Sequence, residues 1–163
     1  MKNIDYRLLE YSGSRWYYST ISELDNIELV AGNKSGRQYK IDQMRRMARR
    51  IDEYTSSCSE CEQYREEFSN LINNVELHLQ KKSKEALKKY RTGLKDIQSH
   101  LTARHKLINK GHYTIVGFNF GIAIGTAIVS VMDSKLYIIA SIATGLITGY
   151  ILDIRARRKD RII

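Results

Sequence analysis

Two uncharged apolar runs near the C-terminal end constrain this 163-residue chain more than any other feature. Residues 113–132 form a run of 20 without a charge, and residues 136–152 form a second run of 17. A helix crosses a hydrocarbon core of ~30 Å with about 20 residues, so each run has roughly the length of a membrane span. The remaining chain is too polar to wrap two helices that are apolar on every side. We therefore predict two membrane spans and not the core of a soluble fold.

The residues around the two runs predict their arrangement. Only Asp133, Ser134 and Lys135 lie between them, so the spans, 113–132 and 136–154, form an antiparallel hairpin. Basic residues flank both spans on the same side: Arg104, Lys106 and Lys110 before the first, and Arg155, Arg157, Arg158, Lys159 and Arg161 after the second. By the positive-inside rule we expect a multi-pass protein of the cell (inner) membrane with both termini in the cytoplasm.

Small residues recur at every fourth position of both spans. The two ridges, a glycine zipper, are Gly117, Gly121 and Gly125 in the first span and Ser141, Gly145 and Gly149 in the second. Such ridges let helix backbones approach closely, which is a main source of helix association in lipid. One ridge can join the hairpin to itself and leave the other for a neighbouring subunit of a homo-oligomer.

Polar residues form a second line on each span. The lines are Asn119, Ala123, Thr126 and Ser130, opposite the first glycine ridge, and Tyr137, Ser141, Thr144 and Thr148. Polar side chains at this depth either bond to another helix or face water. The candidates for a pore lining are therefore Asn119, Ala123, Thr126, Ser130, Ser141, Thr144 and Thr148. Thr and Ser can bond their own helix backbone, and only Asn119 needs an outside partner. Both interpretations stay open.

The part before the spans is predicted to be mainly α-helical. An apolar series with steps of three and four favours a coiled-coil stalk over residues 41–110: Met44, Met47, Ile51, Tyr54, Cys58, Cys61, Arg65, Phe68, Ile72, Val75 and Leu79. A break is expected at 55–57, where Ser57 and Glu60 match a capping box. A second helix is expected over 83–110, with a kink at Asn109 and Gly111. Residues 1–40 form a small cap of three short strands, at 14–18, 27–30 and 37–41, or of short helices.

The net charge of +9 is concentrated beside the first span. Residues 81–110 carry 10 basic and 2 acidic groups, against 11 basic and 13 acidic in residues 1–80. A basic segment next to a span indicates anionic lipid headgroups as partners, in preference to nucleic acid. The candidate headgroup contacts are Lys81, Lys82, Lys84, Lys88, Lys89, Arg155, Arg157 and Arg158.

Cys58 and Cys61 have the spacing of a metal or redox motif, but they also lie on the apolar series, where cysteine packs as a small apolar residue. A zinc site needs about four ligands, which a second copy of the pair in an oligomer supplies. His100 and His105, five residues apart, are expected to lie too far round the helix to share a ligand face. We assign no metal and no cofactor. No phosphate-binding loop, nucleophile elbow or ribonuclease signature occurs, so we predict no catalytic residues and no enzyme.

The hairpin with its three-residue turn and basic edges, behind a helical cytoplasmic stalk, resembles the small two-transmembrane-helix effectors of prokaryotic antiviral defence, such as SLATT-like and CRISPR-associated membrane proteins. The resemblance is one of architecture over about 40 residues. It implies oligomerisation and membrane permeabilisation, that is, a pore-forming or membrane-perturbing effector. The alternative is a non-conducting anchor or scaffold that recruits a cytoplasmic partner.

Overall fold

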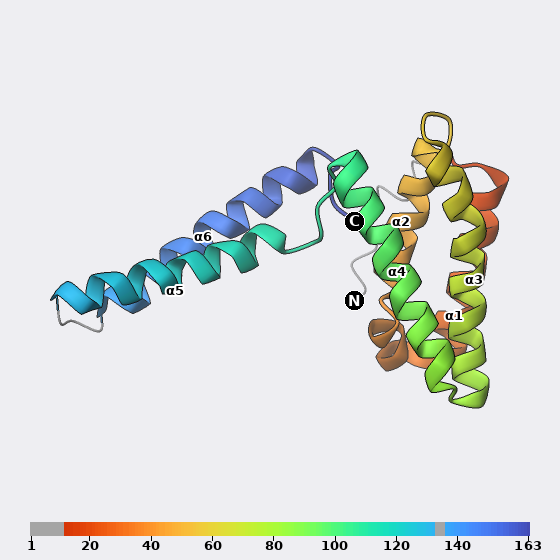
Figure 1. The fold of residues 1–163 in the computed structure, drawn as a ribbon, viewed down its shortest axis with the longest axis horizontal. Coiled ribbons are helices and arrows are strands. Elements are labelled where there is room, and N and C mark those ends of the chain that lie inside the picture. Colours follow the sequence, from red (N-terminus) through yellow and green to blue (C-terminus); the bar gives the residue numbers. More distant parts are fainter. Residues whose placement is uncertain (1–11, 133–135) are drawn as a thin grey trace. The chain divides into compact units, whose positions relative to one another are not determined.

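The computed structural model describes residues 12–132 and 136–163, without the side chains of residues 33–38, 131 and 132. In these residues it is mainly helical and contains six α-helices, α1 to α6, in chain order (Figure 1). No strand occurs in 12–132 or 136–163 apart from a single parallel β-bridge between Ile108 and Ile162. The chain divides between His105 and Lys106 into two compact units. The predicted turn at 133–135 and the first eleven residues of the predicted cap lie outside the described residues.

The first unit is a bundle of α1 (Arg15–Gln38), α2 (Ile41–Tyr54), α3 (Ser59–Lys81) and α4 (Lys84–His105). In Figure 1, α3 and α4 run side by side as an antiparallel pair joined by a short turn. The core is formed by apolar side chains from all four helices, among them Leu24, Met44, Met47, Ile51, Phe68, Ile72, Val75, Ile97 and Leu101. Much of the apolar series in 44–75 therefore lines the inner faces of two separate helices of a bundle, in place of a continuous stalk.

The alternative of three strands for residues 14–41 is wrong for the described part, because α1 covers most of this segment. Within residues 15–32 the buried ones are Tyr17, Thr20, Leu24 and Ile27, at steps of three, four and three, which is helical periodicity. The Ile-Glu-Leu-Val run that favoured a strand leaves Leu29 and Val30 exposed. Gly32, at φ 72°, places a kink inside the helix, at a conformation that glycine adopts without steric cost.

The predicted break between residues 55 and 57 is present, since α2 ends at Tyr54 and α3 begins at Ser59. The capping box is not formed. Cys58 occupies the N-cap position of α3, with no side-chain cap, and the hydroxyl of Ser57 donates to the carbonyl oxygen of Tyr54 instead. Cys58 and Cys61 therefore flank the first turn of α3.

Arg65, the charged member of the apolar series, joins three helices of the bundle. Its Nη2 lies 2.5 Å from Oδ1 of Asp52 on α2, and its guanidinium lies 5.2 Å from the ring centroid of Trp16 on α1. Asp52 also accepts hydrogen bonds from the backbone N–H and the hydroxyl of Ser14, before α1. Because Asp52 is buried, these partners offset the cost of its desolvation.

The expected helix over 83–110 ends earlier, at His105. Lys106 adopts φ 53° and Gly111 φ 81°, so residues 106–111 form a non-helical connection where a kink was predicted. The second unit then contains α5 (His112–Met132) and α6 (Leu136–Arg158), which pack against each other along their length (Figure 1). Its two ends are joined by backbone hydrogen bonds between Ile108 and both Arg161 and Ile163.

Candidate functional site

Helices α5 and α6 are each long and apolar enough to cross a membrane. Their outward side chains are large and exposed, for example Phe120 at 65% and Ile147 at 62%. In the core helix of a soluble protein most residues would be buried, whereas only about a tenth of each candidate span is. The hairpin therefore presents a broad apolar surface, which marks a membrane or protein interaction site.

The two ridges of small residues face each other inside the hairpin. A Cβ added to Gly121 would lie 2.6 Å from the carbonyl oxygen of Ser141, and one added to Gly117 would overlap the carbonyl oxygen of Gly145. Gly125 and Gly149 have the same close contacts, with Ile138 and with Thr114. The idea that one ridge remains for a neighbouring subunit is wrong for this arrangement, because each ridge covers the other.

A carboxylate fixes the register of the hairpin at its open end. Asp153 of α6 is buried and accepts hydrogen bonds from the backbone N–H groups of Tyr113 and Thr114 at 3.2 and 3.0 Å, and from the Thr114 hydroxyl at 2.5 Å. The first N–H groups of a helix have no partner within the helix, and an anion is favourable there. Asp153 thus caps α5 from the neighbouring helix. The sequence analysis missed it because it lies just beyond the second uncharged run.

The polar line of α5 points away from α6. All four members are exposed: Asn119, Ala123, Thr126 and Ser130. Thr126 and Ser130 bond backbone carbonyls of the preceding turn, with Ser130 Oγ 3.0 Å from the oxygen of Thr126. Asn119 Nδ2 also donates to its own helix, at 3.0 Å from the oxygen of Ile115. Its second N–H and its carbonyl oxygen have no bond to the described residues.

The polar line of α6 does not share a face with that of α5. Ser141 lies in the helix interface, and its hydroxyl bonds the carbonyl oxygen of Ile138. Thr144 and Thr148 line an apolar groove of about 440 Å³ along the hairpin, with Val116, Phe120 and Ile124 of α5. Tyr137 is exposed. The candidate pore residues of the two spans are therefore not brought together within one chain.

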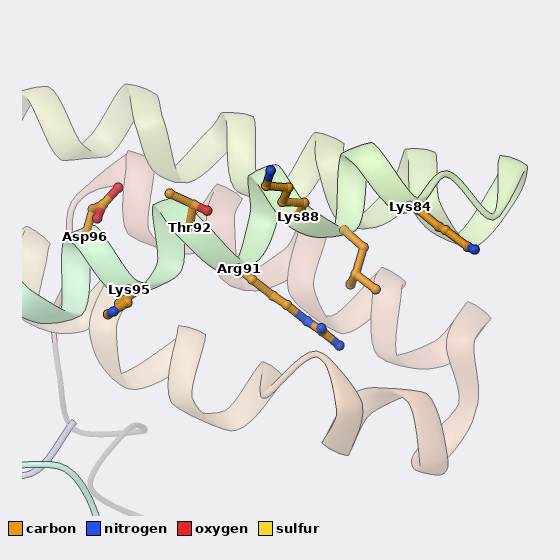
Figure 2. Close-up of a pocket in the computed structure, with 7 residues that line it drawn as sticks. Lys84, Lys88, Arg91, Thr92, Lys95 and Asp96 are labelled. Atoms are coloured by element: carbon orange, nitrogen blue, oxygen red, sulfur yellow. The ribbon is translucent and has the colours of Figure 1, made fainter.

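The basic residues form an exposed face on α4, shown in Figure 2. A shallow groove of about 620 Å³ is lined by Lys84, Leu87, Lys88, Arg91, Thr92, Lys95 and Asp96. Arg91 and Lys95 were not among the predicted headgroup contacts, although the spacing 84, 88, 91 and 95 is that of one helical face. Lys89 pairs with Glu85 at 2.9 Å, while Lys81 and Lys82 are exposed at the end of α3. Arg155, Arg157 and Arg158 are exposed at the end of α6.

Four potential metal ligands converge in the first unit. Cys58, Cys61, His100 and His105 each offer one ligand atom, and these atoms all lie within 4.8 Å of one another. The Sγ atoms of Cys58 and Cys61 lie 3.5 and 3.3 Å from Nε2 of His100, and Cys61 Sγ lies 3.3 Å from Nε2 of His105. The expectation that the two histidines cannot share a ligand face is wrong. The rings reach from the end of α4 to the α2–α3 connection, and their centroids are 5.2 Å apart.

Neighbouring side chains hold both imidazoles in place. Glu60 Oε2 lies 2.7 Å from Nδ1 of His100, so Nδ1–H can donate to the carboxylate, and in that neutral tautomer the lone pair of Nε2 faces the sulfurs. The His105 ring stacks on Tyr54, with centroids 3.9 Å apart. Burial lowers the pKa of His105, and burial together with Cys58 raises the pKa of Cys61 to about 12.

The sequence contains a signal for this cluster in two separate segments. Cys-x2-Cys at 58–61 and His-x4-His at 100–105 are both ligand spacings of zinc sites. A zinc finger has ~12–15 residues between its cysteine pair and its histidine pair, whereas 38 residues separate Cys61 from His100 here. The antiparallel packing of α3 and α4 brings the two pairs together.

Fold and sites together define a helical protein with a four-helix unit and a hairpin of two candidate membrane spans. Comparison with protein-family models, with curated proteins and with solved structures finds no match to this chain.

Proposed function

We propose that this chain is an integral membrane protein of the cell membrane, with both termini cytoplasmic, that self-associates through the outward face of α5. The observation that carries the proposal is the position of Asn119. It lies on the exposed side of α5, away from α6, in the middle of an apolar helix. The basic residues that follow α6 support the cytoplasmic placement of its end.

Asn119 needs a partner outside its own chain. Its amide has two N–H donors and an acceptor oxygen, and one donor is used by the carbonyl oxygen of Ile115. In hydrocarbon each remaining group costs free energy, because no water is present to bond it. A second copy of α5 or an aqueous path satisfies these groups, and the apolar tails of lipids do not.

In the form we favour, several copies bring their α5 faces together and perturb the bilayer or enclose a pore. The lining is then Asn119, Thr126 and Ser130, while the glycine ridges hold each hairpin as a closed unit. The candidate lining from the sequence combined residues of both spans. The lining proposed here uses α5 alone, because Thr144 and Thr148 line the apolar groove of the hairpin. An effector role in antiviral defence rests only on the architectural resemblance to two-span effectors, and we propose it as the biological setting.

A second candidate function is a non-conducting membrane anchor or scaffold for a cytoplasmic partner. The hydroxyls of Thr126, Ser130 and Thr144 all bond carbonyls of their own helices, so they need neither water nor a second subunit. The α1–α4 bundle would then carry the recruiting surface.

Ion flux separates the two candidates. The full-length protein is reconstituted in liposomes, and flux and detergent-complex mass are compared for wild type, Asn119→Leu and the control Ile122→Leu, an exposed apolar position one turn on. The pore proposal predicts self-association and flux in the wild type, and loss of flux in Asn119→Leu because a hydrophobic ring resists wetting. If the Asn119→Leu oligomer is intact and its flux equals that of wild type, this face of α5 does not line a pore. A monomeric wild-type protein without flux supports the anchor.

A further inference from the structure

We propose that Cys58, Cys61, His100 and His105 of a single chain bind one zinc ion in a tetrahedral site that uses both Sγ atoms and both Nε2 atoms. The inference is independent of the proposed membrane function, since all four residues belong to the four-helix unit. It also replaces the sequence-based alternative in which two copies of the cysteine pair are needed.

The distances between the ligand atoms fit a zinc ion at their centre. With Zn–S of ~2.3 Å and Zn–N of ~2.0–2.1 Å, a tetrahedron separates sulfur from nitrogen by ~3.5 Å and sulfur from sulfur by ~3.8 Å. The three S···N distances here are 3.3, 3.3 and 3.5 Å. All pairs fall within 4.8 Å, so side-chain rotations that move a ligand atom by about 1–1.5 Å bring the remaining pairs to tetrahedral distances.

The chemistry of the ligand set also selects zinc. Two thiolates neutralise a divalent cation, so the complete site carries no net charge where Cys61 and His100 are buried. Tetrahedral sets of two sulfurs and two nitrogens are typical of zinc, and carboxylate-rich sets are typical of magnesium and calcium. A bound cation deprotonates a coordinating thiol outright, which overcomes the burial that favours the neutral thiol of Cys61.

Glu60 supplies a contact that metal-binding histidines usually have. A ligating imidazole almost always donates its other N–H to a carboxylate, a carbonyl or water, which fixes the ring and its tautomer. His100 does so to Glu60 at 2.7 Å. Glu60 is a positioning residue here, because its oxygen bonds His100 and not the cluster centre.

Hydrogen bonding among the four groups is the competing explanation, and it accounts for the geometry less completely. Cys61 Sγ lies 3.3 Å from two imidazole nitrogens, and a thiol has one proton to donate to one of them and is only a weak acceptor for an N–H of the other. Nε2 of His100 faces two sulfurs, and in the neutral tautomer that donates from Nδ1 to Glu60 this nitrogen has one lone pair for both of them. One ion satisfies all of these lone pairs together.

The consequence is structural. Four protein ligands fill a tetrahedral shell and leave no open position for substrate or water, which is the pattern of structural zinc sites. The ion would join the start of α3 to the last two turns of α4, which ends seven residues before α5 begins. Metal removal should therefore loosen this end of the bundle.

Metal content of the wild-type protein tests the proposal without any substitution. The full chain, purified in detergent with reductant and without chelator, should hold one zinc per chain by inductively coupled plasma mass spectrometry. After chelation, Co²⁺ should produce the visible bands of tetrahedral cobalt with thiolate charge transfer, and Zn²⁺ should displace it. Substoichiometric zinc together with no cobalt spectrum, or a Cys58–Cys61 disulfide in reductant, would overturn the site.

Variants assign the ligands. Cys61→Ser and His105→Ala should weaken cobalt binding and change the cobalt spectrum, with less thiolate charge transfer in Cys61→Ser, and folding is checked by helical circular dichroism. The neighbouring Ser57→Ala and the exposed His112→Ala should keep the wild-type spectrum. Glu60→Gln should keep the spectrum and weaken zinc binding about 10–100-fold. A cobalt spectrum and affinity of Cys61→Ser equal to those of wild type, or loss of the spectrum in both controls, would show that other residues bind the ion.

Discussion

The carboxylate of Asp153, near the end of α6, accepts hydrogen bonds from both the backbone N–H and the hydroxyl of Thr114, near the start of α5. The two residues are 39 positions apart, and their contact closes the hairpin at the end where the flanking arginines lie. A buried carboxylate at the edge of a candidate span is costly unless it is paired in this way. The contact between Asp153 and Thr114 therefore fixes how α5 and α6 are aligned along each other.

Asp153→Ala should destabilise the hairpin by about 0.5–2 kcal/mol, the usual value of a helix N-cap. The change leaves the N–H groups of Tyr113 and Thr114 without their acceptor. Thermal unfolding of the full chain in detergent, followed by circular dichroism, measures the loss. Asp153→Asn keeps an acceptor oxygen and should lose less. Equal stability of Asp153→Ala and wild type would contradict the capping role.

Gly145→Leu should destabilise the hairpin before it affects self-association. Even a Cβ at Gly145 would overlap the carbonyl oxygen of Gly117, so the two helices must separate. Overpacking of this kind costs about 1–3 kcal/mol. The matched control is Ala143→Leu, an exposed position on the same helix. If Gly145→Leu dissociates the oligomer but leaves the unfolding temperature unchanged, the ridge faces a second subunit instead of α5.

Replacement of Lys84, Lys88, Arg91 and Lys95 by Gln should weaken attraction to anionic lipid. Each basic group near an anionic surface contributes ~1 kcal/mol before screening by salt. The full-length variant with all four substitutions, in zwitterionic nanodiscs, should capture fewer anionic vesicles than the wild-type protein. Lys89→Gln, at a residue already paired with Glu85, is the control. A larger loss of RNA binding than of vesicle capture would assign this face to nucleic acid.

Contact between the basic face of α4 and headgroups beside the span depends on the direction of α4. Lys84 lies ~30 Å along α4 from His105, at 1.5 Å per residue. Surface charges are largely screened beyond a Debye length of about 8 Å. Lys84 therefore reaches headgroups beside the span only when α4 lies along the bilayer surface. In the vesicle assay the added anionic vesicle is a second membrane surface, which Lys84 can contact in any orientation of α4.

Asp52→Ala should be the most destabilising of these changes for the bundle. Asp52 is almost fully buried and holds Arg65 at 2.5 Å and the backbone N–H of Ser14 at 2.8 Å. Removal of one partner from a buried pair costs ~3–5 kcal/mol, and we expect about 2–3 because the Arg65 side chain is 26% exposed. Thermal unfolding measures the loss, and Glu85→Ala, at an exposed pair, should leave the transition unchanged.

The sequence predicts those elements whose signal is contained in one segment. The bounds of α5 and α6 are close to the predicted spans because the absence of charge is a local property. Helix α1 could also have been predicted, since Tyr17, Thr20, Leu24 and Ile27 have helical spacing, but the aromatic and β-branched residues around them favoured strands. The break before α3 was recognised from Ser57, although the residue that occupies the cap is Cys58.

The sites depended on contacts between distant segments, which periodicity does not reveal. His100 and His105 are ~140° apart around α4, so helix geometry alone separates them. Only the packing of α4 on α3 provides a common point, beside Cys61, toward which both rings turn. The facing of the two glycine ridges is likewise a property of the folded hairpin, because either ridge alone has the pattern of an intermolecular contact.

The side of the membrane on which Ser134 lies decides whether α5 and α6 cross the bilayer as a hairpin. Ser134 is between the two helices in sequence. A topology reporter inserted at Ser134 in intact cells, with the same reporter fused after Ile163, distinguishes the sides of the membrane. We predict an external signal at Ser134 and a cytoplasmic signal at Ile163. Cytoplasmic signals at both positions would contradict the membrane hairpin and the function built on it.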